Sequence, residues 1–129
     1  MRRALVFALA GFVTLLAFGL ALLLGSAYFD ARRYAAHQGR LQRLVQQQPR
    51  LEQVVAGLRD DGSPLVQSPQ GEAELRALAA RWPGPRGSEV LDKGRRWPVT
   101  RVFHASDMMY VLYFDQDGVL RDFTCADAR

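Results

Sequence analysis

The stretch VTRVFHASDMMYVLYFDQDGVLRDFT, residues 99–124, decides the fold of the C-terminal half of the chain. β-Branched and aromatic residues dominate it, and its apolar pattern repeats every two residues, which is typical of strands. Two short polar turns, at 106–107 and 115–118, divide it into three runs, 99–105, 108–114 and 119–124. Gly118 suits a turn that needs positive φ. The pattern predicts three antiparallel strands with one face of the sheet in water.

Two short helices are predicted before these strands. The first covers residues 50–59, and the second begins with Ser68 as N-cap and ends before Pro83. The segment 60–64 is predicted to be a linker, and Arg86–Pro98 a polar, basic loop. Residues 50–129 are therefore predicted to form a small α+β domain, with two short helices on a three-stranded antiparallel sheet. The predicted core residues are Leu75, Leu78, Val102, Met109, Val111, Leu112, Tyr113, Phe114, Val119 and Phe123.

The N-terminal segment has the composition of a membrane span. Ala4–Leu24 is an uncharged, almost wholly apolar run of 21 residues, and roughly 20 such residues cross a bilayer core as a helix. Tyr28 and Phe29 follow, where interfacial aromatic residues are expected. We therefore predict an uncleaved transmembrane anchor over residues 1–29. A signal peptide cut between Ala27 and Tyr28 is the alternative.

The flanking charges bear on orientation. Arg2 and Arg3 favour a cytoplasmic N-terminus, whereas Arg32, Arg33, Arg40 and Arg43 on the other flank oppose it. We favour an anchor in the inner (cytoplasmic) membrane with the C-terminal domain in the periplasm. The arginines after the span are also candidates for binding anionic lipid headgroups, which makes membrane lipid a predicted partner.

Residues 30–49 are predicted to be a juxtamembrane helical stalk. Its apolar stripe has heptad-like spacing and is interrupted at Pro49. The stripe fits either a coiled-coil homodimer or a helix that packs on its own domain. Within the membrane segment, Ala17, Ala21 and Gly25 form a small-xxx-small line that would allow close packing of another helix.

No constellation of residues points to catalysis. The chain has 129 residues, one cysteine and two histidines, which excludes a large enzyme and a disulfide scaffold. Cys125 lacks the local signature of a cysteine nucleophile, and His104, Ser106 and Asp107 are predicted to be a strand end and turn. The acidic turn at 115–118 lacks the spacing of a calcium loop. We predict no enzyme activity, no metal and no cofactor.

The basic segment around the predicted loop is the candidate surface for a partner. Tryptophan and arginine are enriched in binding hot spots, and this segment contains Trp82, Arg86, Arg95, Arg96 and Trp97. The same combination occurs in proteins that bind single-stranded nucleic acid. Residues 30–129 contain 15 basic and 13 acidic residues, a net charge of only +2. This small charge and the membrane tether both disfavour nucleic-acid binding, so we predict a protein partner and no nucleic acid.

The C-terminal half resembles a known family. The helix ending in Trp-Pro-Gly-Pro at 82–85, and the run YVLYFDQDGVLRDF at 110–123, are similar to the corresponding passages of SmpA/OmlA (BamE-like) domains. The resemblance implies two helices on a three-stranded antiparallel sheet and a periplasmic setting in Gram-negative bacteria. Members that assemble the outer membrane are typically lipoproteins, but no cysteine lies near the end of the apolar run here.

Together these features predict a membrane-anchored envelope protein with a small, non-catalytic interaction domain. The partner would be another envelope or membrane protein. Two alternatives remain. One is a ligand sensor or small enzyme that uses the sheet face near His104 and Tyr110. The other is a subunit of a membrane complex that associates through its transmembrane helix.

Overall fold

The computed structural model describes residues 1–128, which form two units, Met1–Ala36 and the residues from His37 onward. From Arg2 onward the first unit is helical and belongs to α1 (Arg2–Gln46). None of its residues is buried, and Leu5, Phe7 and Leu23 are each more than 70% exposed. Among the described residues, this is one helix that is long and apolar enough to cross a membrane.

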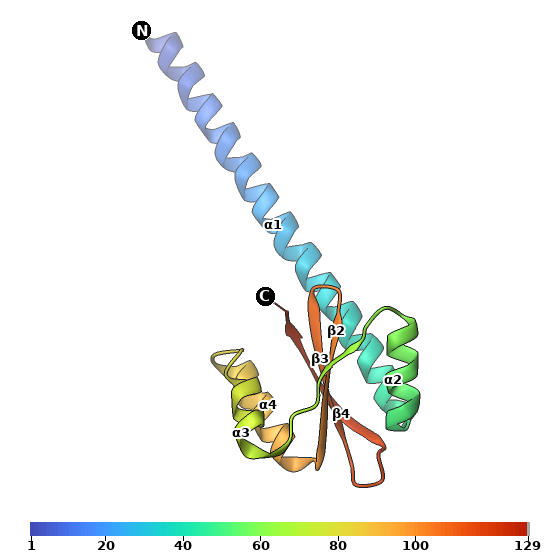
Figure 1. Ribbon diagram of the computed structural model, residues 1–129. Coiled ribbons are helices and arrows are strands. Elements are labelled where there is room, and N and C mark those ends of the chain that lie inside the picture. The colour runs from blue at the N-terminus through green and yellow to red at the C-terminus, as the bar shows by residue number, and fades with distance from the viewer. Residues whose placement is uncertain (129) are drawn as a thin grey trace. The chain divides into compact units, whose positions relative to one another are not determined.

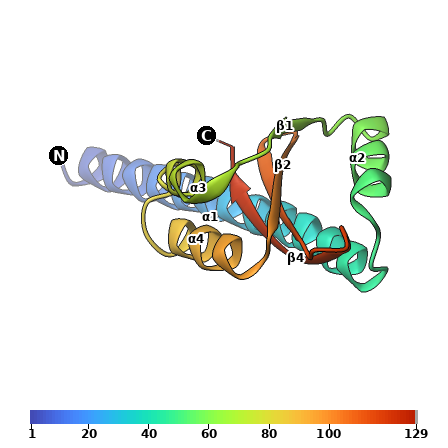
Figure 2. The same ribbon diagram turned by 60° about the horizontal axis from the view of Figure 1, so that its bottom comes forward.

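The second unit is an α+β domain with helices on both sides of a sheet (Figures 1 and 2). After the last turns of α1 come α2 (Leu51–Asp60), β1 (Leu65–Gln67), α3 (Gly71–Ala79), α4 (Pro85–Arg96), β2 (Val99–Ala105), β3 (Met108–Phe114) and β4 (Leu120–Asp127). The sheet is antiparallel in the order β1-β2-β3-β4. Helices α3 and α4 cover one face, and α2 with the last turns of α1 covers the other (Figure 1).

The core therefore lies on both faces of the sheet, and the prediction of one wet face was wrong. All seven residues of β3 are buried. Met109, Val111 and Tyr113 pack with residues of α3 and α4, whereas Tyr110 contacts His37 of α1 on the opposite face. A strand covered on both sides is apolar throughout, and MMYVLYF fits that description.

The sheet has four strands, which corrects the predicted three. The additional strand, β1, has three residues and pairs with β2 across an irregular register. Its sequence Leu65-Val66-Gln67 lies between Ser63-Pro64 and Ser68-Pro69, so it is too short for alternation to be recognised.

Helix α4 occupies the segment that was predicted to be a basic loop. Only Val90 and Leu91 are apolar within it, and Gly87 and Gly94 lower its helix propensity. Both glycines lie at close contacts, Gly87 with backbone atoms and Gly94 with a side chain. A Cβ at position 87 would lie 2.2 Å from the Trp82 carbonyl oxygen, and one at position 94 would lie 2.4 Å from Leu75 Cδ1. The small and apolar residues at 87, 90, 91 and 94 form the helical face that could have revealed α4.

The heptad-like stripe packs on its own domain. Leu41 is fully buried and Leu58 is 3% exposed, both within the second unit. Helix α1 is continuous from Arg2 to Gln46, with no break between the predicted anchor and stalk. Pro49 precedes the N-cap of α2, Arg50, so it interrupts no helical hydrogen bond.

The outer edge of β4 is protected by side chains. The Phe123 N–H donates to Asp122 Oδ1 (2.8 Å), and its carbonyl accepts from Lys93 Nζ (2.7 Å). The Trp82 indole N–H donates to the Asp127 carbonyl (2.7 Å). Because these groups bond to side chains, they offer a poor template for another strand.

The remaining predictions for the domain were largely confirmed. Strands β2 and β3 have the predicted bounds, and β4 extends three residues beyond the predicted end. Helix α3 has Gln70 as N-cap, so it begins later than predicted from Ser68. Eight of the ten predicted core residues are buried, while Val119 and Phe123 are half-buried.

Candidate functional site

The two tryptophans of the predicted partner surface belong to the packing of α3 and α4. Trp82 is 8% exposed and packs in the cluster that includes Leu78 and Val90. Trp97 follows the end of α4, is half-buried and packs against the same cluster. Its indole nitrogen is buried and has no hydrogen-bond partner among the described residues. Trp82 is therefore a structural residue, while Trp97 keeps part of its ring at the surface.

A small cleft brings Arg95 and Trp97 together. It has a volume of about 240 Å³ and lies where the start of α3 meets the end of α4. The residues that line it are Pro69, Gly71, Glu72, Leu75, Gly94, Arg95, Trp97, Pro98 and Thr100. Two of the five predicted partner residues thus share one concave surface.

Charge in this cleft is balanced by one carboxylate. Glu72 Oε1 accepts from Arg95 Nη2 (2.5 Å) and from Arg76 Nε (3.1 Å). The hydrogen bond from Arg95 is the main reason that the pKa of Glu72 lies below its ordinary value. The hydrogen bond to Glu72 is the main cause that raises the pKa of the Arg95 guanidinium, and Asp92 adds a second negative charge near it.

The other two arginines of the predicted surface lie on α4. Arg86 Nη1 donates to Glu89 Oε2 (3.0 Å), and Glu89 also pairs with Lys93 (3.2 Å). Arg96, in the last turn of α4, is exposed. Lys93, Arg95 and Arg96 lie in the last turn of α4, where they interact favourably with the helix dipole. Arg86 lies in the first turn, about 13 Å along the helix from Arg95.

The pair His104 and Tyr110, considered for a ligand site, does not share a face. His104 pairs with Met109, which in turn pairs with Ala126, whereas Tyr110 pairs with Phe103 and Cys125 in the next row. Side chains in adjacent rows point to opposite faces of a sheet. His104 is exposed and Tyr110 is fully buried.

Cys125 is separated from His104 by the sheet. It is fully buried, and burial raises its pKa to about 11. A thiol that stays protonated is a poor nucleophile. The geometry therefore does not join these two residues into a Cys–His pair.

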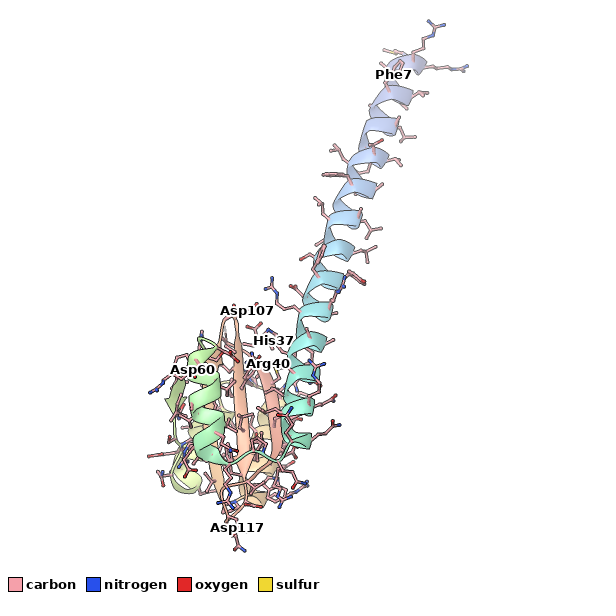
Figure 3. The ribbon with its side chains drawn as sticks, turned by 90° about the vertical axis from the view of Figure 1, so that its right-hand side faces the viewer. Phe7, His37, Arg40, Asp60, Asp107 and Asp117 are labelled. Atoms are coloured by element: carbon pink, nitrogen blue, oxygen red, sulfur yellow. The ribbon has the colours of Figure 1, made fainter. Side chains whose placement is uncertain are left out.

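Tyr110 instead forms a small cluster with α1 that sequence reasoning missed. Its hydroxyl bonds to His37 Nδ1, and the Arg40 guanidinium carbon lies 6.0 Å from its ring centre. Figure 3 shows His37 and Arg40 on the same stretch of α1, beside the strands. Burial is the main cause that raises the pKa of Tyr110, and Arg40 opposes it. The sequence feature that could have predicted this cluster is the position of His37 on the apolar stripe. From the sequence alone, His37 was not matched with a residue of the strands.

The acidic turn between β3 and β4 uses its carboxylate for the backbone. Asp115 Oδ1 accepts from the N–H groups of Asp117 (2.9 Å) and Val119 (3.0 Å), and Oδ2 accepts from Arg121 (2.8 Å). This confirms the predicted hairpin turn. Within residues 1–128, no group of three His, Cys, Asp or Glu side chains is arranged to hold a metal ion.

The small residues of the N-terminal helix lie in the first unit. Ala17 and Ala21 are exposed and Gly25 is half-exposed. A Cβ built at Gly25 would meet nothing within 4 Å. This side of the helix is therefore open to another helix.

Comparisons with known proteins give no family assignment. No protein-family model matches the chain, and neither the curated proteins nor the solved structures that were searched gave a significant match.

Proposed function

We propose that this protein is a single-pass membrane protein whose α+β domain binds another protein of the cell envelope. The observation that carries the anchor is the exposure of α1. Its first 36 residues contain no buried residue, although they include large apolar side chains such as Phe7, Phe12 and Leu16. Burying such side chains yields about 1.5–3 kcal/mol each, so a bilayer would stabilise this helix strongly.

The proposed binding surface is the α4 side of the domain. It combines the cleft at Arg95 and Trp97 with the exposed Arg96, and Arg86 lies in the first turn of the same helix. Trp82 supports it from the core. Arginine and a partly exposed tryptophan at a concave surface fit a partner segment that carries carboxylates.

The proposed setting is the inner membrane, with the domain in the periplasm. The motif at 110–123 supports a relationship to SmpA/OmlA (BamE-like) domains. The retained apolar helix would make this chain an inner-membrane form of such a domain, with a scaffolding or assembly role and no catalytic step.

A C-terminal topology reporter tests anchor and setting together. We expect an alkaline phosphatase fusion to be active, because this enzyme folds only outside the cytoplasm, and the mature mass to include Met1–Ala27. An inactive phosphatase fusion would contradict the periplasmic setting, and a mass that begins at Tyr28 would contradict the anchor.

The partner surface is tested by photo-crosslinking in intact membranes. A photoreactive residue in place of Arg96 should form a discrete adduct. The same residue in place of Arg59, which is exposed on α2, serves as the matched control. Equal adducts at both positions, or none at Arg96, would count against a specific surface on α4.

A second candidate function places the interface in the membrane. The open side of α1 at Ala17, Ala21 and Gly25 favours packing against another transmembrane helix. Ala21→Leu should then disrupt the complex while the domain stays folded. A complex that survives Ala21→Leu would dispose of this candidate.

A further inference from the structure

A second concave surface lies on the opposite side of the sheet, between the last turns of α1 and α2. Its volume is about 460 Å³, and all its residues belong to the second unit. The floor is apolar, formed by Leu44, Val54 and Leu58. Polar side chains, including Gln47 and Gln53, line its rim. An apolar floor with a few polar groups at the rim is the usual composition of a ligand site.

The charge at the rim is asymmetric. Arg40 and Arg43 enter the groove from α1, and Asp61 is the one acidic residue that lines it. Asp61 is already paired with Arg40 at 2.5 Å. Among the described residues, no acidic side chain pairs with Arg43. The groove therefore offers one uncompensated guanidinium beside an apolar floor.

A glycine in α2 keeps this groove open. Gly57 lies in the interior of α2, where glycine costs about 1 kcal/mol relative to alanine. A Cβ at position 57 would meet nothing within 4 Å, in contrast to Gly87 and Gly94 of α4. Packing within the chain thus gives no reason for Gly57. An occupant of the groove would give one, because a side chain at this position would project into its space.

The lining of the groove suits an extended occupant. Its residues run from Arg40 to Gln47 at the end of α1 and from Gln53 to Asp61 along and just beyond α2, which corresponds to about 12 Å of helix. An alkyl chain of similar length can lie on the apolar floor between the two helices, with an anionic head at Arg43.

We propose that the groove binds a free single-chain amphiphile with an anionic head. The head pairs with Arg43, and the alkyl chain lies on Leu44, Val54 and Leu58. This site is separate from the α4 surface, and the proposal does not depend on which membrane α1 crosses.

The test uses the full chain in nanodiscs of zwitterionic lipid, titrated with decanoate. An environment-sensitive dye on Gln47→Cys reports from the groove rim, and the same dye on Gln116→Cys, in the β3–β4 turn, reports general effects. Cys125 is buried and stays unlabelled. Decanoate should change the Gln47→Cys signal in a saturable way and leave the Gln116→Cys signal unchanged. Propionate and decyltrimethylammonium should bind at least tenfold more weakly, since each lacks the chain or the negative charge.

Two matched pairs of variants complete the experiment. Arg43→Gln should weaken decanoate binding about tenfold, whereas Arg59→Gln, outside the groove, should not. Gly57→Leu fills open space and should block binding in a domain that still unfolds cooperatively, whereas Gly39→Leu should not block it. Absence of saturable binding, equal binding of the cationic amphiphile, or unchanged binding in both groove variants would overturn the proposal.

Discussion

The two parts of α1 have the same backbone and opposite surroundings. In residues 2–36 no side chain is buried, although most of the first 24 are apolar. In residues 37–46 the same helix buries Leu41 completely and joins the sheet through His37 and Tyr110. The comparison shows that a continuous helical backbone does not determine whether its side chains are buried or exposed. The side chains of each part determine whether the helix packs in the protein core or leaves its apolar surface uncovered.

The largest expected effect is the loss of membrane association when the predicted anchor is disrupted and the domain stays folded. Replacing Leu15 and Leu16 together by arginine should release the chain from membranes, since each arginine at the centre of a span costs about 2.5–3.5 kcal/mol. Fractionation after alkaline carbonate extraction measures this. Replacing Gln46 by arginine, at the other end of α1, is the control and should leave the chain in the membrane pellet. A doubly substituted chain that stays membrane-bound would contradict the anchor.

The same substitution at two positions of α1 sharpens the comparison. Leu41→Ala should lower the free energy of unfolding of the domain by about 2–5 kcal/mol, because it leaves a cavity in the core. Leu16→Ala should leave that free energy unchanged. Denaturant unfolding of the full chain in nanodiscs, followed by near-ultraviolet circular dichroism, compares them. If both variants lowered the free energy of unfolding equally, the two parts of α1 would contribute equally to the core, which would contradict the comparison.

Two helical glycines should respond with opposite signs. Gly87→Ala should destabilise the domain by about 1–3 kcal/mol, because its Cβ would meet the backbone carbonyl of Trp82. Gly57→Ala should stabilise it by up to about 1 kcal/mol, because its Cβ meets open space. Thermal unfolding of both variants measures the difference. A stabilised Gly87→Ala variant would show that α4 is packed differently.

The smallest expected effect is a change in the stability of the domain at low pH. The N–H of Val119 and then Arg121 hold the pKa of Asp115 below its ordinary value. Its stabilising contribution is therefore present above about pH 4, and it is lost as the pH falls through the lowered pKa. Asp115→Asn should reduce the loss of domain stability on acidification, as measured by unfolding at pH 3 and pH 7. Membrane retention should not change over this range, since the first acidic residue is Asp30.

Much of the fold could be predicted because local signals and packing agree. The strands at 99–105 and 108–114 follow from their β-branched and aromatic composition, and the Asp115–Gly118 turn follows from its turn residues. Helix α4 was missed because Gly87 and Gly94 have low helix propensity, and only their contacts with Trp82 and Leu75 explain them. Strand β1 was missed because three residues carry no period.

The candidate site was harder to predict than the fold. The sequence placed Trp82 and Arg86 in one surface because they are close in the chain, but Trp82 packs inward. The α1–α2 groove combines Arg43 with Val54 and Leu58, which lie on two helices separated by Pro49. Such a site depends on how the helices pack, and no local pattern specifies that.

The most direct test of the anchor is the depth of α1 in a bilayer. Nitroxide labels at positions 16 and 46 of the full chain in liposomes should differ sharply. The label at 16 should be accessible to oxygen and shielded from a water-soluble nickel chelate, and the label at 46 should show the reverse. A label at 16 that the chelate reaches as readily as the label at 46 would contradict a membrane anchor over residues 1–29.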